Sequence, residues 1–277
     1  MMELMDAPAS HEAAAAPAAA PEPRLATHST ADDTRSALRF ITCGSVDDGK
    51  STLIGRLLLD SRNVLQDQLA NVSRSGTADL AQFTDGLTAE REQGITIDVA
   101  YRYFSTARRK FIIGDTPGHE QYTRNMVTAA SNADAAVVLV DATKLPWHAD
   151  TAVSEHHALL PQTRRHSLLA RLLRVPTLVF AVNKLDAVAD PALAFANIRR
   201  ALEAFAIAAG IPVAGIVPIS ALRGNNVVNA DPDWCGYSGP ALLPLLEQLP
   251  AATSENTLAL AFPVQWVEKL AEDAARP

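Results

Sequence analysis

Eight residues, from Gly44 to Ser51, have the types and spacing needed to hold phosphate groups. They read GSVDDGKS, which fits the pattern G-x-x-x-x-G-K-[ST] between an apolar run and a helical pattern. Such a loop curls so that its backbone N–H groups point at phosphate oxygens, and the following helix N-terminus adds positive charge. We expect Lys50 to bridge the β- and γ-phosphates and the Ser51 hydroxyl to bind Mg²⁺. The expected contacts are Gly44, Ser45, Val46, Asp47, Asp48, Gly49, Lys50 and Ser51.

Two acidic residues, Asp47 and Asp48, lie inside this loop although its ligand is a polyanion. Because the loop binds phosphate through backbone amides, we expect both carboxylates to point outward. A second interpretation is that Asp47 helps to hold a monovalent cation beside the phosphates.

A second motif, NKLD at 183–186, follows an apolar strand pattern and predicts a guanine site, so that the expected ligand is GTP. The Asp186 carboxylate can accept hydrogen bonds from the guanine N1–H and 2-amino group, which adenine lacks. We expect Asn183 to hold the neighbouring loops and the N7 side, and the Lys184 stem to lie along the ring. Ser220 and Ala221 are expected to offer a backbone N–H to the guanine O6 atom.

A third motif, DTPGH, follows another strand pattern and carries the residues expected to act on the γ-phosphate. Asp115 is expected to hold a magnesium-bound water, and Gly118 to turn its amide toward the γ-phosphate. His119 is expected to face the attacking water, either as a neutral imidazole that orients it or as a charged one that stabilises the transition state. The alternative is a surface histidine at a helix start. The motif comprises Asp115, Thr116, Pro117, Gly118 and His119.

The polar segment 85–96 ends just before a strand pattern, as expected of a loop that orders around γ-phosphate and Mg²⁺. Thr96 is the expected second protein ligand of Mg²⁺, and we count it as catalytic together with Lys50 and His119. Ile95 and Val46 are candidates for an apolar gate in front of His119, while simple packing at a strand edge also explains Ile95.

Apolar strand patterns alternate with helical patterns along the chain, which predicts an α/β fold. We expect a P-loop NTPase G domain with a mostly parallel six-stranded sheet and helices on both faces. Only the strands at 97–104 and 110–114 are close enough to form an antiparallel hairpin. The other expected strands are 38–43, 135–140, 177–182 and 215–219, and the expected later helices are 119–131, 163–173, 192–209 and 240–248.

Composition excludes several other classes of protein. The 277 residues carry 24 Lys and Arg against 31 Asp and Glu, a formal net charge of −7, so we expect no membrane and no direct nucleic-acid partner. Apolar runs are interrupted well before the roughly 18 residues that a membrane-spanning helix needs. The two cysteines, Cys43 and Cys235, show no metal-ligand spacing and are expected to be packed, reduced thiols of a cytoplasmic protein. Residues 1–37, rich in Ala and Pro, are expected to form a disordered tail.

Together the motifs resemble the translation-factor class of GTPases, and most closely the family of sulfate adenylyltransferase subunit 1. The resemblance spans residues 38–265. It rests on GSVDDGKSTLIGRLLLDS at 44–61, DGLTAEREQGITIDVAYRYFST at 85–106, DTPGHEQYTRNMVTAAS at 115–131 and QTRRHS at 162–167.

This resemblance implies a reaction and a partner. GTP hydrolysis would drive the formation of adenylyl sulfate and pyrophosphate from ATP and sulfate, with the adenylyl transfer carried out by a separate catalytic subunit, subunit 2. A loop ordered by γ-phosphate can bias the conformation of such a partner. The alternatives are a GTPase like a translation elongation factor and a fragment that binds GTP and GDP but activates nothing.

The chain departs from the family pattern at two places. Segment 145–161 is extra and is expected to be a surface loop; a solvated insertion explains His148, His156 and His157 better than a metal site does. The family continues through two β-barrel domains, so we expect a GTP-binding domain at 38–252 and, at 253–277, the truncated and poorly ordered start of a barrel.

Overall fold

The computed structural model describes residues 37–61, 98–147 and 159–251, together with 264 and 266. All of these belong to one compact unit of the chain, Arg35–Pro277. No helix within the described ranges is both long and apolar enough to cross a bilayer.

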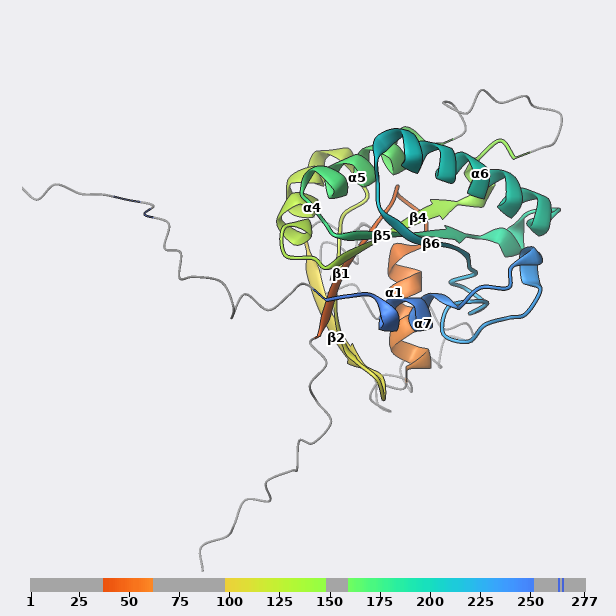
Figure 1. Cartoon of the computed structure of the whole chain (residues 1–277), viewed down its shortest axis with the longest axis horizontal. Coiled ribbons are helices and arrows are strands. Elements are labelled where there is room, and N and C mark those ends of the chain that lie inside the picture. Colours follow the sequence, from red (N-terminus) through yellow and green to blue (C-terminus); the bar gives the residue numbers. More distant parts are fainter. Residues whose placement is uncertain (1–36, 62–97, 148–158, 252–263, 265, 267–277) are drawn as a thin grey trace, which may run out of the picture. The chain divides into compact units, whose positions relative to one another are not determined.

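A six-stranded sheet forms the centre of the molecule, with the strand order β2-β3-β1-β4-β5-β6 (Figure 1). Only β2 runs antiparallel to its neighbour, which confirms the expected hairpin and the α/β fold class. All seven residues of β4 are buried, because helices cover both faces of the parallel part of the sheet. The strands are β1 (Leu38–Cys43), β2 (Ala100–Ser105), β3 (Lys110–Asp115), β4 (Ala135–Asp141), β5 (Thr177–Asn183) and β6 (Val213–Pro218).

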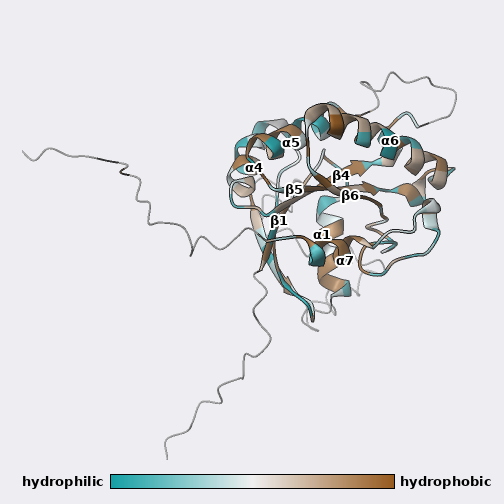
Figure 2. Ribbon diagram, in the orientation of Figure 1, coloured by the Kyte–Doolittle hydropathy of each residue, from teal (hydrophilic) through white to brown (hydrophobic). Residues whose placement is uncertain are grey.

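Two layers of helices enclose the sheet, and each layer has its own apolar core. Met126, Ala170 and Ile198 come from the helices of one layer, α4 (Thr123–Ala130), α5 (Pro161–Leu172) and α6 (Pro191–Ala209). Leu53 and Leu246 come from the helices of the other, α1 (Lys50–Asp60) and α7 (Leu242–Gln248). Hydrophobic residues predominate along the central strands β4 and β5 (Figure 2).

Local sequence signals set several of the helix ends. Pro161 and Pro191 stand in the first turns of α5 and α6, where a missing N–H is tolerated. The Asp190 carboxylate caps α6 by accepting a hydrogen bond from the Leu193 N–H at 3.0 Å. Gly210 ends the same helix with a left-handed φ of 61°.

Several expected boundaries were wrong by a few residues. Strand β2 begins at Ala100, which pairs with Asp115, the last residue of β3; of the expected start at 97–99, residues 98 and 99 are not in the strand and residue 97 lies outside the described part of the chain. The helix expected at 119–131 is divided into a 3₁₀ turn, η3 (Glu120–Tyr122), and α4. Helices α5 and α7 begin at Pro161 and Leu242 rather than at 163 and 240, and β6 runs from 213 to 218.

The ends of segment 145–161 are not part of a surface loop, which corrects the expectation for them. Leu145, Trp147 and Leu159 are buried in the same core as α5 and α6. The Asn197 side chain of α6 donates a hydrogen bond to the Trp147 carbonyl at 2.9 Å. Residues 148–158 between these anchors, including the three histidines, lie outside the described part of the chain.

Both cysteines are buried free thiols, as expected. Burial raises the pKa of the Cys43 thiol to about 12, with a smaller opposing effect from Lys50. Burial also raises the pKa of the Cys235 thiol to about 12, and the nearby Asp231 carboxylate adds to this effect. Both side chains therefore stay protonated and act as packing residues at neutral pH.

Replacing Trp147 by alanine is expected to destabilise the fold by about 3 kcal/mol, because a large buried side chain is lost from the core. The measurement is the free energy of unfolding in urea. Trp266→Ala is the matched control, since that side chain is 83% exposed and its loss is expected to change little. Equal losses in the two variants would show that Trp147 is not a core anchor.

Candidate functional site

The loops that carry the sequence motifs meet at one edge of the sheet. The phosphate loop follows β1, whereas Asp115, Asp141 and Asn183 are the last residues of β3, β4 and β5. Neighbouring parallel strands end together, and the register places Asp141 directly opposite Asn183. This carboxyl edge is where ligands bind in open α/β sheets.

The phosphate loop is bent by residues with left-handed backbone conformations. Asp47 has a φ of 62° and Gly49 a φ of 93°. At Gly49 a side chain would also collide with the amide of Asn183. Glycine is therefore favoured there both by the left-handed backbone and by the lack of space. The Asn183 Nδ2 atom donates a hydrogen bond to the Asp48 carbonyl at 2.8 Å and so ties the loop to β5.

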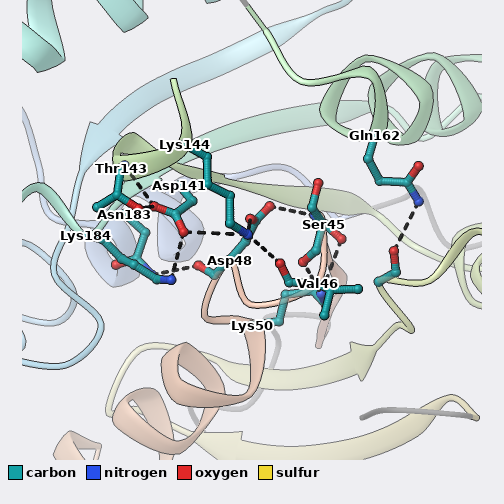
Figure 3. Close-up of polar contacts among 12 residues, drawn as sticks. Ser45, Val46, Asp48, Lys50, Asp141, Thr143, Lys144, Gln162, Asn183 and Lys184 are labelled. Atoms are coloured by element: carbon teal, nitrogen blue, oxygen red, sulfur yellow. Dashed lines mark hydrogen bonds and ion pairs between the residues drawn. The ribbon is translucent and has the colours of Figure 1, made fainter. Parts of the chain in front are cut away.

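The Asp48 carboxylate points into the loop and is fully buried, which corrects the expectation that it points outward. Its Oδ2 atom accepts a hydrogen bond from the Ser45 N–H at 2.6 Å. Its Oδ1 atom lies 2.9 Å from the ammonium group of Lys144 (Figure 3). Burial raises the pKa of Asp48, and Lys144, Lys50 and the Ser45 amide offset part of that effect.

The Lys50 ammonium group is enclosed by the phosphate loop. It donates hydrogen bonds to the carbonyls of Gly44 at 3.2 Å and Ser45 at 2.8 Å. Burial lowers its pKa, while the Asp115 and Asp48 carboxylates oppose this change. A side chain at Gly118 would come within 2.6 Å of the Lys50 ammonium, so the backbone of Gly118 lies against it. Two residues expected to meet one phosphate group are therefore neighbours.

The residues of the DTPGH motif have defined partners. The Asp115 carboxylate accepts a hydrogen bond from the Thr42 hydroxyl at 3.0 Å, and the Thr116 hydroxyl donates to the Thr42 carbonyl at 2.6 Å. Thr116 and Pro117 are buried, whereas His119 is half-buried. The His119 ring lies edge-on to Tyr122 at a centroid distance of 6.3 Å.

Of the expected base-binding residues, Ala221 contacts the Asn183 amide directly, while Ser220 and Asp186 have other partners. The Asn183 Oδ1 atom accepts a hydrogen bond from the Ala221 N–H at 3.0 Å, so the amide expected to face guanine O6 is engaged by Asn183. The Ser220 N–H donates to the Asn225 carbonyl at 3.2 Å. Asp186 forms an ion pair with Arg223 at 3.3 Å.

Four residues around the loop were missed by the sequence analysis. Asp141 directly follows the apolar strand pattern at 135–140, and Lys144 lies three residues further on. Their position at the end of a predicted strand could have indicated that they belong to the site. Gln162 and His166 lie within QTRRHS, which was used as a family marker without a structural role.

His166 connects α5 to the phosphate loop. Its Nδ1 atom accepts a hydrogen bond from the Gly44 N–H at 3.1 Å. Its Nε2 atom lies 3.1 Å from the Gln162 side chain, which itself donates to the Gly118 carbonyl at 3.1 Å. Burial lowers the pKa of His166 to about 4, and the charges of Lys50 and Arg165 contribute to the shift. The neutral imidazole is the form that can accept the Gly44 hydrogen bond.

The expected magnesium site is only partly described. Ser51 and Asp115 supply oxygen donors, the atom type that Mg²⁺ prefers. Thr96, Ile95 and the rest of 85–96 lie outside the described residues. Across the described ranges, no three His, Cys, Asp or Glu side chains form a cluster suited to a metal ion.

Residues 35–255 match the family described as Elongation factor Tu GTP binding domain. The chain belongs to this family. The family match covers each of the sequence motifs discussed above, from the phosphate loop to Ala221. This GTP-binding domain family and the six-stranded sheet confirm the G-domain fold expected from the sequence.

Relatives of this GTP-binding domain include several proteins named sulfate adenylyltransferase subunit 1, which confirms the resemblance seen in the sequence. Sulfate adenylyltransferase subunit 1 of Cellvibrio japonicus is 51% identical over 243 residues, covering 85% of this chain and 49% of the relative. The bifunctional enzyme NodQ of Rhizobium sp. strain BR816 is 51% identical over 251 residues, covering 88% of this chain and 38% of the relative. The chain thus spans half or less of the length of these two relatives.

Solved structures support the same fold. A bacterial selenocysteine-specific elongation factor, EF-Sec, has a TM-score of 0.51 and 25% identity, covering 69% of this chain and 26% of that one. The GTP-bound GTPase-like domain of Ski7 from S. cerevisiae has a TM-score of 0.62 and 19% identity, covering 77% of this chain and 49% of that one. The Ski7 likeness concerns the fold alone.

The buried His166 predicts a loss of stability in acid. Its pKa is about 4 in the folded protein and 6.5 in the unfolded chain, so between these values the unfolded chain binds the extra proton. The contribution of His166 to the free energy of unfolding is therefore complete above pH 6.5. It falls by up to about 3 kcal/mol as the pH drops from 6.5 to 4. We expect His166→Gln, measured by urea unfolding at pH 7 and pH 5, to lose less stability than wild type over that interval. An equal loss in both proteins would contradict the assignment.

Proposed function

We propose that this chain binds GTP with Mg²⁺ and hydrolyses it. The observation that carries the proposal is the Asn183 side chain, which joins the phosphate loop and the Ala221 loop through its two hydrogen bonds. That arrangement holds a phosphate-binding element and a base-binding element at the same edge of the sheet. A nucleotide bound there would place its phosphates beside Lys50 and its base beside Asp186.

Each end of the nucleotide has its own set of residues in this proposal. The amides of the phosphate loop and Lys50 would bind the β- and γ-phosphates. Ser51 and Thr96 would hold the magnesium ion, and Asp115 would hold a water bound to it. The ion neutralises charge on the phosphates when it is bound. Gly118 directs its amide toward the γ-phosphate, and His119 orients the attacking water or stabilises the transition state.

Guanine recognition is assigned to the carboxylate of Asp186. Its Oδ2 atom is held by Arg223, and its neighbour Lys184 takes a left-handed conformation with a φ of 61°. The Lys184 ammonium group is drawn to Asp141 at 2.7 Å, which fixes the direction of its aliphatic stem. That stem is then available to lie along a base held by Asp186.

Removing the Asp186 charge is expected to weaken guanine binding selectively. In Asp186→Asn, one of the two acceptors for the base becomes a donor, and the dissociation constant for GDP should rise by about tenfold or more. The measurement is titration with GDP and ADP. Asp233→Asn is the matched control, because Asp233 is exposed and its left-handed backbone conformation suits asparagine. Equal binding of GDP and ADP by the unmodified chain would overturn the guanine assignment.

His119→Ala is expected to separate binding from hydrolysis. If His119 acts on the attacking water, the rate of GTP hydrolysis should fall about a hundredfold while nucleotide affinity is retained. Single-turnover hydrolysis and equilibrium binding provide the two measurements. Full hydrolysis by the variant would support the alternative of a surface histidine. The half-buried position of His119 beside Tyr122 is compatible with either role.

We further propose that hydrolysis serves sulfate activation. The support is the name shared by several relatives near 50% identity, sulfate adenylyltransferase subunit 1. On this proposal GTP hydrolysis promotes formation of adenylyl sulfate and pyrophosphate from ATP and sulfate by a catalytic subunit 2, in the cytoplasm. The two unpaired thiols agree with a reducing compartment.

The test is an adenylyl sulfate assay with the catalytic subunit, in the presence and absence of this chain and GTP. Faster synthesis that requires both supports the proposal. GTP hydrolysis without any effect on adenylyl sulfate formation would count against it. Hydrolysis stimulated by ribosomes would instead favour the elongation-factor alternative, for which the likeness to EF-Sec is the supporting observation.

A further inference from the structure

A row of four alternating charges runs from the phosphate loop to the base-binding motif (Figure 3). We call Asp48, Lys144, Asp141 and Lys184 the charge row. Lys144 lies 2.9 Å from Asp48 and 3.7 Å from Asp141, and Lys184 lies 2.7 Å from Asp141. Both aspartate side chains have no exposed surface, whereas both lysine side chains are about a third exposed.

Asp48 presents a physical problem at a site that must attract phosphate. A fully buried negative charge within the loop repels a polyanion and is itself destabilised by the loss of water. Lys144 contacts Asp48 directly, whereas Lys50 donates hydrogen bonds to the Gly44 and Ser45 carbonyls. Lys144 therefore forms the direct ion pair with Asp48, and the charge of Lys50 adds a smaller effect.

Lys144 also holds the backbone of the loop. Its ammonium group donates a hydrogen bond to the Val46 carbonyl at 2.6 Å. A carbonyl turned toward Lys144 cannot point into the space where phosphate oxygens would lie. One side chain thus compensates the carboxylate and orients a peptide group of the same loop.

Asp141 holds Lys144 in place from the other side. The Asp141 Oδ1 atom accepts hydrogen bonds from the Thr143 N–H at 2.9 Å and from the Thr143 hydroxyl at 2.6 Å. Burial alone would raise the pKa of Asp141, but Lys184 and the Thr143 hydrogen bonds outweigh it and keep the pKa below its ordinary value. At neutral pH a charged Asp141 therefore anchors both lysines of the charge row.

We propose that Lys144 is a positioning residue of the nucleotide site, which neutralises Asp48 and fixes the Val46 carbonyl so that the phosphate loop accepts an anion. This inference rests on the proposed nucleotide binding. It assigns a binding role to a residue outside the three sequence motifs.

The test compares variants of the full chain with a fluorescent GDP analogue, measuring its affinity and dissociation rate alongside the thermal midpoint of unfolding. Lys144→Met is expected to raise the dissociation constant about tenfold or more, because Asp48 is left unpaired beside the phosphates. Lys144→Arg, which keeps the charge, is expected to restore most of the affinity. Lys110→Met is the matched control, since Lys110 is exposed at the start of β3, away from the carboxyl edge.

A double variant distinguishes charge compensation from a purely structural effect. Asn at position 48 keeps an oxygen for the Ser45 N–H but carries no charge, so Asp48→Asn combined with Lys144→Met should regain most of the lost affinity. Equal affinity of wild type and Lys144→Met overturns this inference alone, and so does a double variant as weak as Lys144→Met. Failure of the wild-type chain to bind the analogue overturns the proposed function and this inference with it.

Discussion

The side-chain amide of Asn183 is the contact on which the whole edge of the sheet depends. One amide has a donor and an acceptor on the same rigid plane, and here each has a single buried partner. The donor serves the Asp48 carbonyl and the acceptor serves the Ala221 N–H, from loops that follow β1 and β6. Because a buried group without its partner is destabilising, the positions of the two loops are coupled through β5.

Several charged side chains lie at the same edge of the sheet, and their burial affects their pKa values. Burial raises the pKa of Asp48 and lowers the pKa of Lys50. The partners of Asp141, in contrast, keep its pKa below the ordinary value despite its burial. The neutral His166 adds a hydrogen-bond acceptor without adding charge. The loop therefore combines fixed ions with uncharged polar contacts, and its affinity for an anion depends on their balance.

Much of the fold and the main motifs could be predicted from the sequence, because both depend on local patterns. Apolar runs in the sequence predicted all six strands. Parallel strands that end at one edge of the sheet place their loops at that edge. The orientation of Asp48 could not be predicted, since it depends on Lys144, which is distant in sequence but close in space. The same holds for His166, whose role requires knowing that α5 packs beside Gly44. Boundaries at Pro161 and Ala100 depended on caps and strand partners rather than on hydrophobic periodicity.

The burial of Trp147 and Leu159 in a single core bears on how the number of residues between them can vary. Trp147 and Leu159 are held at two fixed points of that core, so packing of the domain, and not the length of the sequence between them, sets where the two residues lie. Closing a longer flexible loop between fixed ends costs only about 0.6 kcal/mol for each doubling of its length. Changes in the number of residues between Trp147 and Leu159 are therefore expected to affect the stability of the core much less than changes to the two buried side chains themselves.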